Sequence, residues 1–413
     1  MSILVLNAGS TSLKFAVFDA SAETVLLSGS IDWADGQRAQ AKVMIEPRGA
    51  PMIRRTAAVP DEGAAARLAI EAASASQAIT VIGHRVVHGG AHFGASVRVD
   101  PSVKAAVSKL CALAPLHNPP ALAAIEAAES LLPGVPQVAV FDTAFFARLP
   151  ERAFLYPLPY EWYERFGVRR FGFHGISNAW CAKRAAELLG ADRRTPRLIT
   201  CHLGGGCSAT AVCGGEPVAT TMGFSPLDGL MMGSRCGSMD PGLLLHLLRE
   251  GGVSVAELDR ALNHRSGLLG ISGLAPDLAP IEAAAQRGDA RARLAWEMFA
   301  GRVRAAIGAL AVQMNGIDAL VFTDRIGEGS PALRAAACEG LQCLGVRLDA
   351  AKNQANPLDS DIAAADSAVR VLVVRTREDL MIAGEARRVM LAWQNPMRGP
   401  DGRPIPCCAA GGG

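Results

Sequence analysis

Little in this sequence points to a nucleic-acid or membrane partner. Its 41 Lys and Arg residues nearly balance 39 Asp and Glu residues, so the formal net charge is only +2 and no overall field attracts a polyanion. Aromatic residues make up only 5% of the chain and do not alternate with basic runs, as they often do on nucleic-acid surfaces. No apolar stretch approaches the ~20 residues that a membrane-spanning helix needs. We therefore expect neither nucleic acid nor membrane as a partner.

The ten cysteines form no C-x-x-C pair, which is a common sign of a zinc or redox site. Cys201, Cys207 and Cys213 recur every six residues, but a turn separates the first two, and their neighbours are apolar or glycine. We expect them to be small buried residues in a reducing compartment. The chain starts with a strand-like run instead of a signal peptide, which predicts a cytoplasmic protein.

The most informative segment lies at the start of the chain. An apolar strand at residues 3–6 leads into a run of small polar residues, and an alternating strand at residues 13–18 leaves it. The hydroxyls of Ser10, Thr11 and Ser12 and the charge of Lys14 suit an anion that approaches the open N–H groups of the turn. The pattern predicts a phosphate cradle on a β-hairpin, although small polar residues also form ordinary hairpin turns.

A second strand–turn–strand unit follows much later in the chain. The apolar run at residues 197–203 ends in His202 and Leu203 and meets Gly204, Gly205 and Gly206, after which another strand begins. Two such turns in two halves suggest a duplicated domain that closes on one nucleotide, as in actin-like ATPases and sugar kinases. We therefore expect an α/β fold of two duplicated actin-like, ribonuclease H-like domains with a cleft between them.

Hydrophobic patterning predicts further elements. Strands are expected at 24–28, 42–45, 79–87, 137–141, 319–323 and 370–374, and helices at 101–114, 119–132, 177–189, 290–315 and 378–393. Asn118 is the expected N-cap of the second helix, and Gly190 and Gly316 are expected to end the third and fourth. The predicted domains are 1–146 with 381–394, and 147–380, joined by a crossover at 146–167. Residues 395–413 have no apolar period and are predicted to be disordered.

Several longer motifs occur in a fixed order along the chain. They are GHRVVHGG (83–90), APLHNPP (114–120), FDTAF (141–145), FGFHGIS (171–177) and TTMGFSPLDGLMMGSR (220–235), followed by MDPG, SGLLGISG and IGEGSPALR. Together they closely resemble the acetate kinases of the acetokinase family, from the first strand to about Leu380. The resemblance implies reversible transfer of the terminal phosphoryl group of ATP to acetate, giving acetyl phosphate and ADP. It also implies Mg²⁺, with Mn²⁺ as an alternative, and a homodimer.

The resemblance also assigns site residues. Arg85 matches the arginine that binds acetate, and the residues matched to phosphoryl transfer are Asp142, His174, Arg235 and His117. For His117, a ring that only orients neighbouring groups is an alternative reading. The residues matched to the pocket for the acetate methyl group, each of which is also an ordinary core residue type, are Val87, Leu116, Phe173 and Pro226. The residues matched to nucleotide and phosphate binding are Ser10, Ser12, Lys14, His202, Leu203, Gly204, Gly205, Gly206, Asp277, Leu278, Ile326, Gly327 and Glu328. Asn7 and Glu378 match the metal positions.

The chain departs from the family pattern on the nucleotide side. Asp324 and Arg325 stand where the family usually has two glycines, and Ala279 stands where it usually has an arginine. Gly205 replaces an asparagine in the second turn. Two alternatives to an ordinary acetate kinase therefore stay open at this point. One is a short-chain acyl kinase with a non-adenosine donor such as pyrophosphate, and the other is a catalytically weak nucleotide-binding paralogue.

Overall fold

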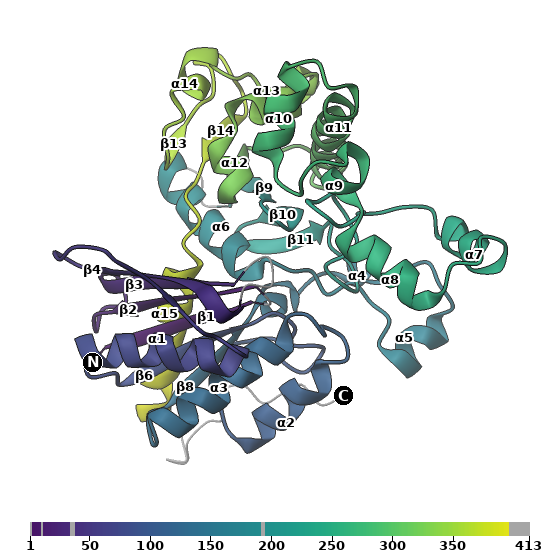
Figure 1. The fold of residues 1–413 in the computed structure, drawn as a ribbon. Helices are drawn as coiled ribbons and strands as arrows, with labels where there is room; N and C mark the ends of the chain where they lie inside the picture. Colours follow the sequence, from purple (N-terminus) through teal and green to yellow (C-terminus); the bar gives the residue numbers. More distant parts are fainter. Residues whose placement is uncertain (1, 10, 34–37, 191–194, 396–413) are drawn as a thin grey trace, which may run out of the picture. The chain divides into compact units, whose positions relative to one another are not determined.

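The structure is a computed structural model that describes residues 2–9, 11–33, 38–190 and 195–395 (Figure 1). The chain divides into two compact units. Unit 1 comprises Met1–Ala147 and Arg377–Gly413, and unit 2 comprises Arg148–Thr376. The predicted disordered tail lies, apart from Asn395, outside the described residues.

Unit 1 is built on an eight-stranded sheet with the order β5-β4-β3-β2-β1-β6-β8-β7. The strands are β1 (Ile3–Ala8), β2 (Ser12–Phe18), β3 (Val25–Asp32), β4 (Ala41–Pro47), β5 (Ile53–Ala57), β6 (Val81–Val86), β7 (Val97–Arg98) and β8 (Gln137–Phe141). The first five pair as antiparallel neighbours, whereas β6 runs parallel to β1 and β8 runs parallel to β6. Strand β1 therefore joins the antiparallel part of the sheet to the parallel strands β6 and β8, and the short edge strand β7 pairs antiparallel with β8.

Helices pack on both faces of this sheet. Helices α1 (Glu62–Ser76) and α3 (Asn118–Leu131) share a core with inward-facing strand residues such as Ile82. Because side chains alternate along a strand, the next residue, Gly83, faces the other helix, α15 (Glu378–Gln394). A Cβ on Gly83 would lie 2.8 Å from Cγ2 of Ile382, so glycine allows α15 to approach β6. The remaining helical segments of unit 1 are η2 (Arg38–Gln40), α2 (Pro101–Leu110) and η3 (Asp142–Phe146).

Unit 2 contains a six-stranded sheet with the order β11-β10-β9-β12-β14-β13. The strands are β9 (Arg197–Leu203), β10 (Cys207–Cys213), β11 (Glu216–Thr220), β12 (Ala319–Thr323), β13 (Ser360–Asp361) and β14 (Arg370–Val373). Strand β9 pairs antiparallel with β10 and parallel with β12, as β1 does with β2 and β6. Next in order, β11 and β14 correspond to β3 and β8. This shared topology confirms the predicted duplicated α/β fold.

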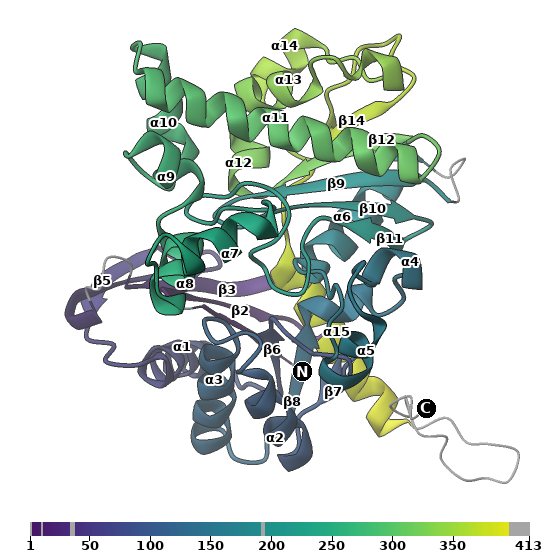
Figure 2. The ribbon, with the colours of Figure 1, turned by 90° about the vertical axis from the view of Figure 1, so that its right-hand side faces the viewer.

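The two main helices of unit 2, α6 (Gly175–Leu189) and α11 (Ala290–Gln313), lie on opposite sides of the sheet (Figure 2). Helix α6 faces the even-numbered residues of β9, because Ser177 and Asn178 hydrogen bond with His202 and Thr200. Two short helices, α12 (Asp324–Gly329) and α13 (Pro331–Cys338), follow β12. The remaining helical segments of unit 2 are α4 (Glu151–Phe154), α5 (Tyr160–Phe166), α7 (Pro241–Arg249), α8 (Val255–His264), α9 (Gly267–Ser272), α10 (Leu278–Gln286), η4 (Leu341–Leu344) and α14 (Ala350–Ala355).

Several predicted boundaries are confirmed. The predicted strands at 137–141, 197–203 and 319–323 match β8, β9 and β12. Gly190 ends α6 with a φ of 81°, as expected of a residue that stops a helix in a conformation that glycine adopts easily. Gly316 has a φ of 100° and follows α11, which ends two residues before the predicted limit.

Other predictions are wrong. Helix α1 and strand β5 were not expected. The N-cap of α3 is His117 and not Asn118. The Asn118 side chain instead accepts a hydrogen bond from the backbone N–H of His88 and donates one to the backbone carbonyl of His88. Cys201 and Cys207 are buried as predicted, but Cys213 is exposed at the end of β10. The six-residue spacing failed there because β10 leaves the core at its last residue.

Candidate active site

The first turn of unit 1 joins β1 to β2 as a hairpin. Asn7 pairs with Lys14 across the two strands, and the N–H of Gly9 donates to the carbonyl of Ser12 over 2.8 Å. Lys14 is exposed and Ser12 is half-buried, which leaves both side chains within reach of solvent. Ser10 lies outside the described residues. The predicted strand–turn–strand geometry is therefore confirmed, while phosphate binding by this turn stays a prediction.

Beside this turn, three neighbouring strands bring polar side chains together at their carboxyl ends. Arg85 lies near the end of β6, and Asp142 directly follows β8. Asp142 Oδ2 accepts from Arg85 Nε over 3.1 Å and from Nη2 over 2.6 Å, and Asn7 Oδ1 on β1 accepts from Arg85 Nη1 over 3.2 Å. Asp142 is fully buried, whereas the Arg85 side chain is 19% exposed. The charge pair therefore holds the Arg85 guanidinium in one orientation with part of it reachable from solvent.

Glu378 extends this cluster from the first residue of α15. Its Oε2 accepts from Asn7 Nδ2 over 3.3 Å. The two residues predicted as metal positions, far apart in sequence, are therefore in direct contact. Both offer oxygen atoms, the donor type that Mg²⁺ prefers. The described residues hold no group of three His, Cys, Asp or Glu side chains that suits a metal ion.

The other residues predicted for unit 1 lie on separate segments. Val87 follows β6 and is buried. Leu116 is 39% exposed, and His117 is half-buried at the start of α3. Their contacts with an acyl group or a phosphoryl group stay predictions.

In unit 2, the glycine turn (residues 204–206) joins β9 to β10. The N–H of Gly204 donates to the carbonyl of Gly206 over 3.1 Å, which makes the turn tight. A Cβ on Gly206 would lie 3.3 Å from His174 Nε2 and 3.6 Å from Arg235 Nη1. The turn therefore lies close to the ends of both His174 and Arg235, the two residues of unit 2 that the resemblance matched to phosphoryl transfer, and that role stays a prediction.

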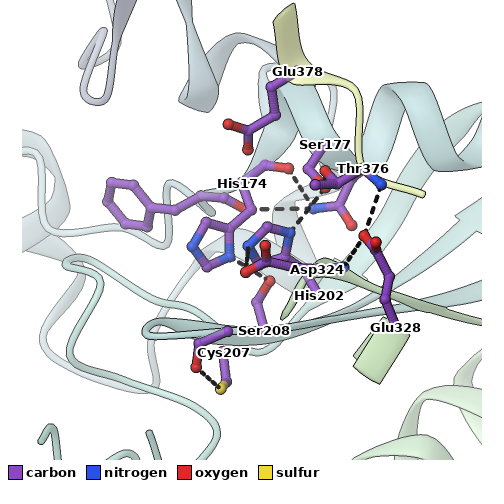
Figure 3. Close-up of polar contacts among 12 residues, drawn as sticks. His174, Ser177, His202, Cys207, Ser208, Asp324, Glu328, Thr376 and Glu378 are labelled. Carbon is purple, nitrogen blue, oxygen red and sulfur yellow. Dashed lines mark hydrogen bonds and ion pairs between the residues drawn. The ribbon is translucent and has the colours of Figure 1, made fainter. Parts of the chain in front are cut away.

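His174 directly precedes α6 and has a φ of 57°, a left-handed conformation that is uncommon outside glycine. Its Nδ1 lies 2.9 Å from Ser208 Oγ on β10, and its ring stacks on the His202 ring with centroids 4.0 Å apart. On the far side, His202 Nδ1 lies 2.9 Å from Ser177 Oγ (Figure 3). These contacts fix the His174 ring with Nε2 toward the glycine turn. The preceding residue, Phe173, is buried.

Arg235 is half-buried in the long loop after β11. Burial lowers the pKa of its guanidinium from the ordinary value, but an arginine stays charged at neutral pH. Its Nη1 donates to the carbonyl of Pro226 over 3.4 Å. Pro226, predicted as an apolar wall, thus also positions the arginine through its backbone.

The IGE segment lies in α12. Ile326 and Gly327 are buried, and Glu328 Oε1 accepts the N–H groups of Asp324 over 3.0 Å and Thr376 over 2.8 Å. Burial raises the pKa of Glu328. Near α12, Arg325 forms an ion pair of 2.5 Å with Asp277, and the neighbouring Leu278 is buried at the start of α10.

Arg334, which was not among the predicted site residues, holds this segment in place. The side chain is completely buried in α13 and donates to the carbonyls of Gly327 over 2.8 Å and Glu328 over 2.9 Å, as well as to Asn353 Oδ1. Burial lowers the pKa of Arg334 to about 10. The only signal in the sequence is a charged residue inside the otherwise apolar run ALRAAAC.

Comparisons with known proteins point to one family. The model of the acetokinase family matches residues 2–384. The acetate kinase of Gloeobacter violaceus is 49% identical over 96% of this chain and all of its own length. The crystal structure of the Porphyromonas gingivalis acetate kinase has a TM-score of 0.85 at 36% identity, covering 94% of this chain and 99% of that one. That of a Francisella tularensis propionate kinase has a TM-score of 0.87 at 35% identity, with the same coverage.

Proposed function

The chain belongs to the acetokinase family, and we propose that it catalyses reversible transfer of the terminal phosphoryl group of ATP to acetate. It is an enzyme, a phosphotransferase with a carboxyl group as acceptor. The family and the relatives favour this activity over a non-adenosine donor and over a paralogue without useful turnover. The observation that carries the proposal is the approach of His174 and Arg235 to the glycine turn.

The chemistry explains why this set of residues suffices. Acetate is already ionised at neutral pH, so its oxygen attacks phosphorus without a general base. Two anions must be aligned, and the charge of the transferring group must be neutralised. In our proposal Arg85 holds the acetate, while Arg235 and the Nε2 of His174 stabilise the equatorial oxygens of the phosphoryl group. The phosphoryl group leaves ADP and passes directly to the acetate oxygen.

Asn7 and Glu378 are the residues that we propose for Mg²⁺, with Mn²⁺ as an alternative. Their oxygen donors and their mutual contact fit an ion that keeps several waters and needs few protein ligands. Such an ion neutralises phosphate charge on the nucleotide when it is bound. The Asn7 side chain also donates to Glu378, which orients the carboxylate.

In this proposal each unit contributes a different set of residues. Unit 1 carries Arg85 and the predicted metal residues, and unit 2 carries the predicted nucleotide residues around the glycine turn and α12. The apolar residues that we propose for the acetate methyl group are Val87 and Leu116 of unit 1 and Phe173 and Pro226 of unit 2. Because a pocket discriminates one methylene by only about 1–3 kcal/mol, we expect propionate to be a slower substrate.

We also propose a cytoplasmic homodimer. Helix α7 supports the dimer, because it has no buried residue and exposes Leu243, Leu245 and Leu248 to solvent in the single chain. Such a leucine-rich surface is typical of a protein interface. Light scattering at micromolar concentration tests the dimer, and a monomer would contradict it. No helix among the described residues is long and apolar enough to cross a membrane.

The activity is tested by trapping acetyl phosphate as its hydroxamate. We expect product from acetate, ATP and Mg²⁺, and the reverse reaction with ADP. Arg85→Ala should weaken acetate binding and so raise KM for acetate. Arg347→Ala removes an exposed ion pair with Asp366; it is the matched control and should leave activity unchanged. Folded protein that forms no product would refute the proposal.

A further inference from the structure

Asp324 is an unusual residue in its position. It directly follows β12, where Thr323 is paired with His202 of the neighbouring strand β9. Its φ of 62° lies in the left-handed region, which glycine adopts freely and other residues rarely do. The backbone is fixed in this conformation, because the N–H of Asp324 donates to Glu328 Oε1, which also holds Thr376. A side chain is thus placed where the local backbone would suit glycine.

The carboxylate of Asp324 lies against the backbone of the glycine turn. Its Oδ2 is 3.2 Å from His202 Nε2, and a Cβ built on Gly204 would lie only 1.7 Å from the same oxygen (Figure 3). The side chain is 29% exposed, so it is more than half-buried against the turn. The Asp324 carboxylate therefore occupies space next to the backbone that the phosphate groups of a donor are expected to approach.

The charge of the adjacent Arg325 is directed elsewhere. Its Nη2 forms the ion pair with Asp277 Oδ1, and both side chains are about half exposed. His202, in turn, uses Nδ1 for Ser177 and Nε2 for Asp324. A carboxylate therefore lies beside the glycine turn, in contact with an imidazole that is also assigned to phosphate binding.

We propose that Asp324 is a specificity-determining residue of the donor site: its carboxylate acts as an internal anion that competes with the donor's phosphate groups for the glycine turn and His202. This inference rests on the proposed function, since it takes the turn as the donor's phosphate site. Two like charges cannot share one set of donors without repulsion, so the Asp324–His202 contact must open when the donor binds. The carboxylate consequently weakens binding of phosphate groups and leaves the nucleoside and acetate unaffected.

The test compares binding of three probes to the full-length chain by calorimetry: MgADP, Mg-pyrophosphate and adenosine. Asp324→Asn removes the charge and keeps the volume, and Asp324→Gly removes both. We expect each variant to bind MgADP and pyrophosphate roughly 10-fold more tightly than the wild type, about 1.4 kcal/mol, with unchanged affinity for adenosine. Asp366→Asn, at an exposed ion pair of the same unit, is the matched control and should bind all three probes as the wild type does.

Three results would overturn the inference. In the first, neither variant gains affinity for the phosphate probes. In the second, only Asp324→Gly gains, which would make the effect steric. In the third, adenosine gains as much as MgADP, which would place the carboxylate against the nucleoside. None of these measurements needs turnover, so loss of acetate kinase activity in the hydroxamate assay, with the binding pattern intact, would refute the proposed function and leave the phosphate competition standing.

Discussion

Replacing Asp142 with Asn tests whether the buried carboxylate sets the orientation of Arg85. Asp142 Oδ2 receives two donors of the guanidinium, at 3.1 and 2.6 Å, and the carboxylate is fully buried. A hydrogen bond to a charged group contributes about 1.5–3 kcal/mol, and breaking a buried pair costs about 3–5 kcal/mol. Because Asn keeps one acceptor, we expect a loss of about 3 kcal/mol in transition-state stabilisation. At about 1.4 kcal/mol per tenfold change, kcat/KM for acetate should fall by about 10²-fold.

The assay is acetyl phosphate formation at varied acetate, on protein whose circular dichroism and unfolding temperature are measured in parallel. Arg85→Lys is the second variant, since a lysine cannot make the two parallel contacts of a guanidinium and should also raise KM for acetate. Asp366→Asn removes a solvent-exposed carboxylate of similar chemistry and should have no effect. A wild-type kcat/KM in folded Asp142→Asn would show that Arg85 does not depend on this pair, and the reasoning would fail.

His174→Ala and Arg235→Ala should each lower kcat by about 10²-fold, the scale of removing one preorganised donor, and a wild-type kcat in either variant would contradict its role. Arg334→Met should lower the unfolding temperature by about 10 °C in calorimetry, because it leaves the carbonyls of Gly327, Glu328 and Asn353 and the side-chain oxygens of Asn353 and Asn356 without this donor, a loss of about 3–5 kcal/mol. Burial lowers the pKa of His84 from 6.5 to about 4. As the pH falls, the unfolded chain therefore protonates this histidine at a higher pH than the folded chain does. His84 therefore contributes stability that is present above pH 6.5 and lost as the pH falls toward 4. Urea unfolding should show this loss, and His84→Asn should flatten it.

The sequence predicted those elements that carry a strong local pattern. Strand β9 is rich in strand-forming residues and leads into three glycines, so both its length and the turn after it could be predicted. The resemblance assigned Arg85, Asp142 and Asn7 to one active site, and in the structure their side chains are joined by hydrogen bonds.

Elements with a weak pattern were missed. Helix α1 consists largely of alanine, so its buried and exposed faces hardly differ in hydrophobicity, although Asp61 caps its start. Strand β5 lies at the edge of the sheet and has no buried residue, so its sequence lacks the alternation of apolar and polar residues that would predict a strand. Arg334 was missed because its partners are backbone carbonyls and two asparagine side chains about twenty residues away, which no local side-chain pattern reveals.

A comparison of the two duplicated turns explains why we expect one residue of unit 2, Asp324, to affect donor affinity. The turn of unit 1 is flanked by Lys14 on β2, so it has its own positive charge. The glycine turn has no lysine or arginine within it and depends on Arg235 and two imidazoles placed by other elements. One carboxylate above such a turn changes the balance of charge more than it would beside a lysine. In our proposal Asp324, at a position with glycine-like backbone, therefore affects donor affinity through its charge beside the turn and not through the fold.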